Sequence, residues 1–288
     1  MRQKLSRRAI FLGCLLCFLI ASIFPFVSAI DCATEECAGN VSIILGNTAP
    51  TIPYVTPIST VVPTGGTTKT VYVVFNASDV NGYSDLNHST ANVTLWKTSE
   101  TNRSASSCVA QQNTTQVTVF NCSVNMYFYD SAGTWNVDAT VKDDYSETAE
   151  NTTVTFTVDA LDFITQNTAS VIWGTVLLGT NDEQADNTIT LTNGGNQDYT
   201  VLNITGYDAM NGTNIIHAEN FSVDGEAGQT TGQVYMVNAT AVNVTSAIPG
   251  LTTHGASVTE EIFFYLDVPG ALPQGVYTQV ATWKIKVA

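Results

Sequence analysis

Hydrophobic and polar residues alternate along most of the chain, which is the pattern of half-buried strands. Between residues 134 and 142, Trp135, Val137, Ala139 and Val141 share one face and polar residues share the other. Helical periodicity is nearly absent. Two further stretches show the same alternation: residues 70–78, with Val71, Val73, Phe75 and Ala77 on one face, and residues 151–158, with Val154, Phe156 and Val158 on one face.

Turn-forming residues separate these stretches at positions 63–66, 79–87, 131–133 and 143–150. Short alternating strands with such breaks are typical of an antiparallel sandwich. The sequence therefore predicts an all-β fold, and a length of about 260 residues after an export signal suits two domains. We place a first sandwich at residues 48–158 and a second at residues 159–288.

The second half has its own alternating stretches. Ile189, Leu191, Leu202 and Ile204 alternate with polar residues on the two sides of a turn at residues 193–196. Near the end, an apolar run at residues 262–268, a turn-rich segment and a second apolar run at residues 276–287 predict a closing hairpin.

The first 29 residues read as a secretory signal, with basic residues, an apolar run at residues 9–26 and a small-residue cleavage site at residues 27–29. The alternative is an uncleaved anchor, which would be the only membrane contact. Either way we expect the remainder to be extracellular, at the cell surface. Residues 30–47 form an N-terminal extension.

That extension contains a short apolar run, residues 40–45, which must find an apolar partner. We favour the chain's own sandwich, with Val41, Ile43 and Leu45 on one face of its first strand. The alternative is that the run adds a strand to an open sheet edge of a neighbouring subunit, and head-to-tail repetition would then give a filament.

The net charge of the chain limits the classes of partner that it can bind. Without the four cations of the signal, six Lys and Arg stand against 25 Asp and Glu, a net charge near −19. We therefore do not expect nucleic acid or anionic lipid surfaces as partners, and divalent cations are the natural alternative. The partners we expect are other copies of the chain, other cell-surface components and glycans.

Four cysteines follow the signal: Cys32, Cys37, Cys108 and Cys122. An even number in an exported chain indicates two disulfides with three connectivities. We favour Cys32 with Cys37 in a small loop, and Cys108 with Cys122, because each pair is close in sequence and the second brackets a strand pairing. Metal ligation is the rival, but no histidine lies near these cysteines.

Asn-x-Ser/Thr sequons number thirteen, against about five expected by chance from the composition. Asn76, Asn92, Asn151 and Asn220 fall on the polar face of their strands, where glycans would point to water. Asn121 is ambiguous because it shares a face with Val117 and Val119. The predicted glycosylation sites are Asn40, Asn76, Asn87, Asn92, Asn102, Asn113, Asn151, Asn203, Asn211, Asn220, Asn238 and Asn243.

Residues 132–143, AGTWNVDATVKD, resemble the penultimate strand of PKD-type and related immunoglobulin-like modules of exported archaeal and bacterial surface proteins, which commonly read G-x-[YW]-x-V-x-x-x-V-x-D. The resemblance covers residues 48–158. It implies an immunoglobulin-like sandwich with a spacer or adhesion role. The turn at residues 193–196 is similar to the N-x-G-N turn of surface-protein sandwiches, including filament-forming matrix subunits.

The sequence shows no reactive centre. The three histidines, His88, His217 and His254, are far apart in polar, turn-like contexts, and we expect them in solvated loops. No G-x-S-x-G elbow or paired metal-ligand motif is present. The four tryptophans could include a sugar-stacking platform, for which Trp96 is the candidate because it should face outward. Trp135 and Trp283 look like core residues.

One constellation suits Ca²⁺, which accepts six to eight oxygens in irregular geometry. With immunoglobulin topology, the turn after the second strand, with Asp79, Asn81 and Asp85, emerges at the same end as the turn with Asp143. The spacing does not match an EF-hand. The simpler interpretation is that Asp, Asn and Gly are turn formers.

These observations lead to the hypothesis of a non-enzymatic, N-glycosylated cell-surface protein that serves as a coat, surface-layer, stalk or filament subunit. The alternative is an adhesin or carbohydrate-binding module that acts through loops at one end of a sandwich.

Overall fold

The computed structural model describes residues 41–247 and 249–288. The predicted signal, Asn40, Cys32 and Cys37 lie outside the described residues. The chain divides into a segment that ends at Gly46 and a compact unit from Asn47 to Ala288. The compact unit is almost entirely β, as predicted, and its helical residues are confined to short 3-10 turns: η1 (Tyr83–Asp85), η2 (Ala218–Asn220), η3 (Thr245–Ala247) and η4 (Pro249–Leu251). In the part of the chain that is described, no helix has the length and apolar character needed to cross a membrane.

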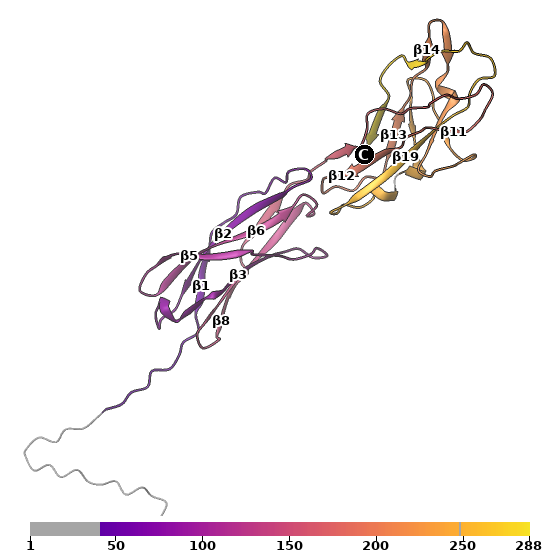
Figure 1. The fold of residues 1–288 in the computed structure, drawn as a ribbon. Coiled ribbons are helices and arrows are strands. Elements are labelled where there is room, and N and C mark those ends of the chain that lie inside the picture. The colour runs from indigo at the N-terminus through magenta and orange to yellow at the C-terminus, as the bar shows by residue number, and fades with distance from the viewer. Residues whose placement is uncertain (1–40, 248) are drawn as a thin grey trace, which may run out of the picture. The chain divides into compact units, whose positions relative to one another are not determined.

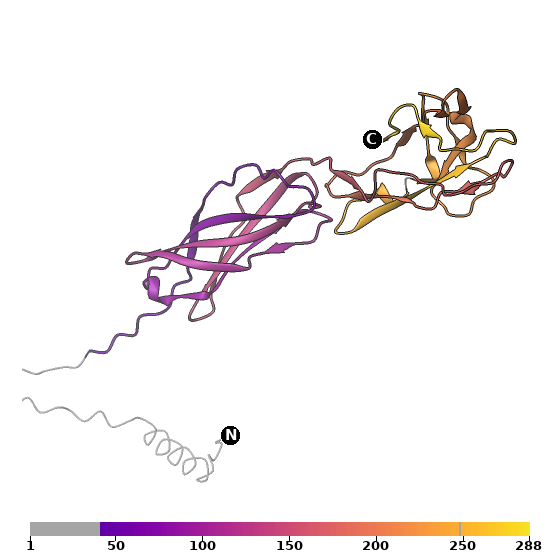
Figure 2. The ribbon, with the colours of Figure 1, turned by 45° about the horizontal axis from the view of Figure 1, so that its top comes forward.

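Residues 51–158 form two antiparallel sheets (Figures 1 and 2). The first contains, in spatial order, β1 (Thr51–Val55), β2 (Thr68–Ser78), β6 (Val117–Tyr127) and β5 (Ser107–Asn113). The second contains β4 (Arg103–Ser104), β3 (Leu86–Trp96), β7 (Gly133–Asp143) and β8 (Thr148–Asn151), with β9 (Thr155–Val158) also paired to β7. In immunoglobulin nomenclature these orders are A-B-E-D and C′-C-F-G, so the fold of this half is immunoglobulin-like.

The alternating residues meet between the two sheets, as the sequence predicted. Trp135 is fully buried, and its indole Nε1 donates to the carbonyl oxygen of Ser131 at 2.9 Å. Phe75 and Phe120 stack with ring centroids 5.1 Å apart. A buried tryptophan needs a partner for its N–H, and here the turn before β7 supplies it. The core of this half therefore fixes both the sheets and the turn that joins them.

The strand predicted at residues 151–158 is in fact two strands, β8 and β9, so that prediction is wrong in its continuity. The Asn151 side-chain Oδ1 accepts hydrogen bonds from Thr153 N at 3.0 Å and Thr153 Oγ1 at 2.8 Å. This local turn competes with the ladder and interrupts it. Val154 is only partly buried against the core.

The second half has a larger sheet and two smaller ones. The larger sheet contains β10 (Ile164–Gln166), β12 (Ile189–Asn193), β19 (Val258–Leu266), β16 (Phe221–Asp224) and β17 (Val234–Tyr235), with β11 (Glu183–Gln184) also paired to β19. The smaller sheets are β18 (Ala241–Asn243), β13 (Leu202–Thr205) and β21 (Lys284–Val287), and β15 (Asn214–Ile216), β14 (Ala209–Asn211) and β20 (Thr278–Gln279). Their buried side chains form a cluster separate from that of the first half, and the alternating Ile189, Leu191, Leu202 and Ile204 all belong to it. The division of the chain after Val158 stays a prediction.

The predicted closing hairpin is wrong. β19 pairs with β12 and β11 on one side and with β16 on the other, while β21 pairs with β13. Residues 262–266 are all buried. A continuous apolar run of this kind is typical of a central strand, which has no free edge for a hairpin partner.

The favoured prediction for the apolar run before the sandwich is also wrong. Residues 41–50 form no strand, and the first strand is β1. Val41, Ile43 and Leu45 are 85%, 76% and 86% exposed. Because β1 already pairs with β2, the sheet edge that this run was expected to fill is occupied without it.

Candidate functional site

Three turns meet at one end of the first sandwich. β2 ends at Ser78 and β7 ends at Asp143, so the turns that follow them lie at the same end of the two sheets. The backbone N–H of Asp144 donates to the carbonyl of Asp85 at 2.8 Å, which joins two of the turns. The N–H of Asp79 donates to the carbonyl of Gln116 at 2.8 Å, which joins the third. The predicted convergence of the turns is therefore observed.

This end carries a cluster of carboxylates, which we call the Asp79 cluster: Asp79, Asp85 and Asp143. Each offers one oxygen, and the three oxygens lie within 4.8 Å of one another. Asp79 and Asp143 are each only 1% exposed, and Asp85 is partly exposed. Three carboxylates at such separations repel one another strongly when they are ionised and removed from water.

Hydrogen bonds satisfy only part of the cluster. Asp143 Oδ1 accepts from the backbone N–H groups of Tyr145 and Glu147, at 2.9 and 2.8 Å. Asp79 Oδ1 accepts from the N–H of Asn81 at 2.7 Å. By contrast, Asp79 Oδ2 and Asp85 Oδ2 are buried and have no hydrogen-bond partner among the described residues.

The electrostatics of the cluster act on Asp85. Burial raises the pKa of the Asp85 carboxyl, and repulsion from Asp79, Asp143 and Asp144 raises that pKa further. No lysine or arginine of the described residues forms an ion pair with the cluster, since the one Arg–carboxylate pair is Arg103 with Asp130. The negative charge is thus left without a cationic partner from these residues.

Asn47 also belongs to this end, and the sequence interpretation missed it. Its side-chain Nδ2 donates to Asp143 Oδ2 at 2.7 Å. Asn81, which was predicted as a ligand, uses its Oδ1 to accept the backbone N–H of Thr48 at 3.0 Å, so its place in a ligand set stays a prediction. The signal for Asn47 was topological: the first strand of this fold begins at the end where these turns lie.

A second group, Asp208, His217 and Glu219, also brings three ligand atoms within 4.8 Å. All three side chains are at least partly exposed. Asp208 Oδ1 accepts the N–H of Ala218 at 2.8 Å, and Asp208 Oδ2 accepts Asn238 Nδ2 at 3.2 Å. Both oxygens of Asp208 are paired and all three side chains are at least partly open to water, so this group shows no demand for a ligand.

The histidines lie partly where the sequence predicted. His217 is exposed, whereas His88 lies within β3 and its Nε2 is 3.3 Å from Thr118 Oγ1, so the loop assignment of His88 is wrong. His254 connects two polar side chains, with Nδ1 2.6 Å from Asp198 Oδ1 and Nε2 2.8 Å from Ser131 Oγ.

This Asp198–His254–Ser131 chain has the order of an orienting acid, a base and a nucleophile. However, the Ser131 hydroxyl donates to the Glu100 carboxylate. A hydroxyl that gives its proton to Glu100 accepts from His254, so the imidazole is not positioned as its base. The arrangement fits a structural hydrogen-bond chain.

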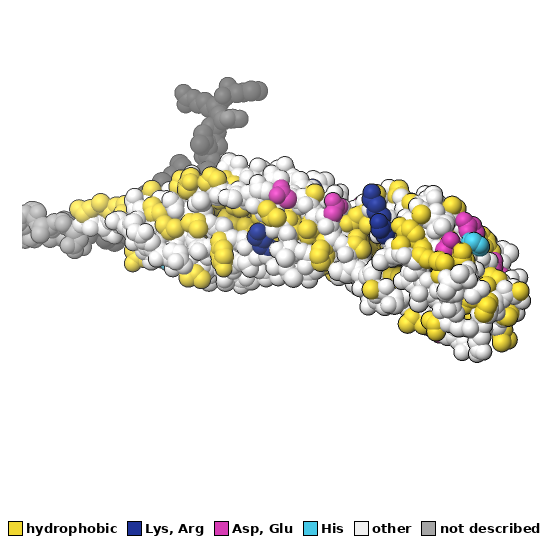
Figure 3. Space-filling model, turned by 90° about the horizontal axis from the view of Figure 1, so that it is seen from above, with side chains coloured by type: hydrophobic (Ala, Val, Ile, Leu, Met, Phe, Trp, Pro, Cys, Tyr) yellow, Lys and Arg dark blue, Asp and Glu magenta, His cyan; other side chains and the backbone are white. Residues whose placement is uncertain are grey.

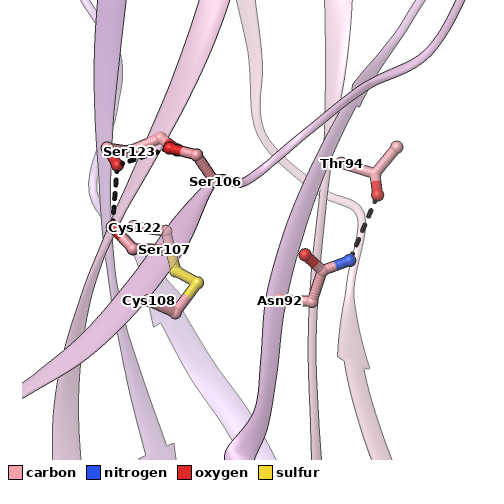
Figure 4. The surroundings of a disulfide bond; sticks show 7 residues. All are labelled: Asn92, Thr94, Ser106, Ser107, Cys108, Cys122 and Ser123. Atoms are coloured by element: carbon pink, nitrogen blue, oxygen red, sulfur yellow. Dashed lines mark hydrogen bonds between the residues drawn. A yellow bond between two sulfur atoms is a disulfide. The ribbon is translucent and has the colours of Figure 1, made fainter.

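One of the two favoured disulfides is confirmed, between Cys108 and Cys122 (Figure 4). These residues face each other across β5 and β6. The surrounding serines add hydrogen bonds between the same strands, including Ser107 Oγ with Ser123 Oγ at 3.0 Å. The bond therefore fastens the edge strand β5 to the inner strand β6.

None of the described sequon asparagines is fully buried. Asn76 and Asn92 are partly exposed beside the fully buried Phe75 and Val93, as the strand alternation predicted. Asn121 lies on the outer face, but its Oδ1 is buried without a partner among the described residues. The exposed sequon asparagines are Asn102, Asn113, Asn238 and Asn243, and the partly exposed ones are Asn76, Asn87, Asn92, Asn121, Asn151, Asn203, Asn211 and Asn220.

The tryptophans follow the prediction. Trp135 is in the core and Trp283 packs against the second cluster, with its ring centroid 5.1 Å from that of Phe221. Trp96 ends β3 and is 37% exposed. On the face drawn in Figure 3, charged side chains are few, hydrophobic and uncharged polar surface predominates, and some acidic side chains lie beside a histidine on the second half.

No family model matches the chain, and no curated protein matches it. Membership of the PKD-type modules therefore stays a prediction. One similar solved structure is described as BspA_C_mut, with a TM-score of 0.23 and 8% sequence identity, and the match covers 78% of this chain and 92% of that chain. A TM-score this low does not define a shared topology. The immunoglobulin-like assignment rests on the strand order of residues 51–158.

Proposed function

We propose that the chain is an exported, N-glycosylated structural subunit of a cell surface, without catalytic activity, that assembles with further copies of itself. The single observation that carries the proposal is the exposed apolar segment before the sandwich. Val41, Ile43, Ile44 and Leu45 are 85%, 76%, 94% and 86% exposed. The sequons and the export signal support an extracellular site, and the all-β fold supports a scaffold role.

Exposure of this segment is costly. Burial of one Val, Leu or Ile side chain stabilises by about 1.5–3 kcal/mol, so four such side chains give a large gain when a partner covers them. Single exposed apolar residues need no explanation, but a contiguous run indicates an interaction site. The run is rich in β-branched residues and extends only from residue 41 to residue 45, which fits addition as a strand to a sheet edge.

Open edges are present to receive it. β5 lies at the edge of the first sheet, and β21 pairs only with β13 within the described part of the second half. Unpaired backbone groups on such edges accept an added strand readily. Donation of residues 41–45 from one copy to an edge of the next, repeated head to tail, builds a filament.

The test uses protein purified from its own host. Intact-mass analysis should exceed the polypeptide mass, and electron microscopy should show ordered assemblies. Removal of residues 41–46 should leave a monomer with unchanged thermal unfolding that no longer assembles. The matched control replaces Leu177 and Leu178, exposed apolar residues elsewhere, with Asp and should still assemble.

Two results would refute the proposal. Native-like assemblies from the truncated protein would remove the segment as the assembling element, and a mass equal to the bare polypeptide would remove the glycoprotein assignment.

A second candidate function, a carbohydrate-binding adhesin, is favoured by the exposed Trp96 on the outer face of β3. An adhesin would be sparse on the envelope, whereas a structural subunit would be abundant and ordered.

A further inference from the structure

We infer that the Asp79 cluster is a Ca²⁺ site, formed by Asp79, Asp85 and Asp143, and that Asn47 supplies a further oxygen ligand. The site is independent of the assembly proposed above. It depends on the geometry of one end of the first sandwich, and its test is separate from any measurement of filaments.

The unpaired oxygens are the reason to expect a ligand there. Asp79 is 99% buried, yet its Oδ2 lacks a hydrogen-bond partner among the described residues, as does the buried Oδ2 of Asp85. Buried carboxylate oxygens are expensive unless a donor or a cation compensates them. The turn geometry explains Asp79 Oδ1 and Asp143 Oδ1, which cap backbone N–H groups, but it does not explain the two unpaired oxygens.

The donor chemistry selects the ion. Every candidate ligand atom is an oxygen, and no histidine or cysteine belongs to the cluster, which disfavours zinc. The ligands come from two turns and from Asn47, which precedes β1 in the chain, and such an irregular set suits Ca²⁺ better than Mg²⁺, which demands octahedral geometry. Asp85 is partly exposed, so water can complete the coordination from its side.

Asn47 connects the site to the start of the compact unit. The Asn47 side-chain Nδ2 donates to Asp143 Oδ2 at 2.7 Å. A donor in this position favours the negatively charged cluster when no cation is bound. A half-turn of the amide exchanges Nδ2 for Oδ1, because the two ends of an Asn side chain have the same shape. Asn47 can therefore donate to Asp143 without the ion and coordinate the ion when it is bound.

The position of Asn47 connects the proposed ion site with the apolar segment. Asn47 is the first residue of the compact unit, and the apolar segment that ends at Gly46 precedes it directly. Thr48 is held in turn by Asn81 Oδ1. A cation that binds Asn47 thus restrains the residue from which the apolar segment departs.

The experiment titrates the full secreted chain, first treated with a chelator, with Ca²⁺ and with Mg²⁺. Calorimetry should give one Ca²⁺ per chain whose binding requires Asp85, with a Kd of about 10⁻³ M or tighter. Thermal unfolding should rise by about 5–10 °C at a Ca²⁺ concentration near 100 times Kd, because only the folded state binds. Mg²⁺ at the same concentration should give a smaller rise.

Two substitutions that each remove one negative charge distinguish a Ca²⁺ ligand from a nearby carboxylate that does not bind the ion. Asp85→Asn should abolish the Ca²⁺-dependent rise without lowering the unfolding temperature in chelator, because it removes a repelling charge and no hydrogen bond. Asp144→Asn, at an exposed neighbour, should keep the rise. Absence of the rise in the unmodified chain, or its full retention in Asp85→Asn, would overturn the site.

Asn47→Asp tests whether Asn47 is the fourth ligand, because it should change the unfolding temperature in chelator and the affinity for Ca²⁺ in opposite directions. It should lower the unfolding temperature in chelator, because it loses the donor to Asp143 and adds repulsion. It should also bind Ca²⁺ more tightly than the unmodified chain, because it adds a charged oxygen. Weaker Ca²⁺ binding by Asn47→Asp would show that Asn47 is only a donor to Asp143 and would remove it from the ligand set.

Discussion

Removal of the Cys108–Cys122 disulfide should destabilise the first sandwich without unfolding it. The perturbation is the double substitution Cys108→Ala and Cys122→Ala, compared with the unmodified chain after reduction. Alanine is preferred at position 122 because the side chain is fully buried, and a serine hydroxyl there would lack a partner. The reduced chain keeps both sulfur atoms, whereas the double substitution leaves the predicted Cys32–Cys37 loop closed, so agreement between the two assigns the effect to the Cys108–Cys122 cross-link.

The magnitude follows from the length of the closed loop. The two cysteines are 14 residues apart in sequence. In the chain-entropy description, a loop of this size restricts the unfolded state by about 3 kcal/mol. For a unit of this size that corresponds to a fall in unfolding temperature of about 6–12 °C. The ladder between β5 and β6 and the serine hydrogen bonds remain, so the fold should persist.

Differential scanning calorimetry measures the fall, and hydrogen exchange locates it. Amides of β5 should lose protection first, because β5 is an edge strand held only by β6, whereas β2 is paired on both sides. Equal unfolding temperatures for the oxidised and reduced chains would refute the reasoning. So would a loss of protection that is greater in β2 than in β5.

Two further predictions concern single side chains. Burial and the neighbouring Glu150 raise the pKa of Asp138, whose Oδ1 is buried without a partner among the described residues, so folding favours its protonated form. The contribution of Asp138 to stability is therefore highest at low pH and is lost as pH rises through its folded-state pKa. Asp138→Asn should raise the free energy of unfolding near pH 7 by less than about 1 kcal/mol after solvent screening, with no gain near pH 3 in calorimetric scans. An equal gain at both pH values would contradict this. Gly195→Ala should destabilise by about 3 kcal/mol, because the added Cβ meets the backbone carbonyl oxygen of Leu161, whereas the control Gly270→Ala, with open space around it, should change the denaturation midpoint little.

The sequence predicted those parts of the fold in which burial alternates. Trp135, Val137 and Ala139 sit on one face of β7 and are fully buried, because period-two alternation determines which face of a strand meets the core. It also predicted that the turns with Asp79 and Asp143 converge, because strand order fixes the end at which each turn emerges.

Pairing partners were harder to predict. Residues 262–266 are buried without alternation, so periodicity could not show that β19 pairs on both sides. Strand order indicates the end of the sandwich at which Asn47 lies, but it does not show that the Asn47 side chain donates to Asp143, 96 positions away in sequence. Side-chain hydrogen bonds of such range depend on the finished packing and leave no local pattern.

An isolated parallel bridge between the segment after β1 and the end of β9 has a mechanical consequence. Val61 and Val158 form a parallel bridge, in which Val61 N donates to Thr157 O at 2.8 Å and Asp159 N donates to Val61 O at 2.9 Å. β1 starts opposite Ser78, near the Asp79 cluster, whereas Val158 pairs with Gly133 at the far end of β7. Tension applied between these two points pulls the two segments of the bridge past each other, so its two hydrogen bonds bear the load together instead of opening one after the other.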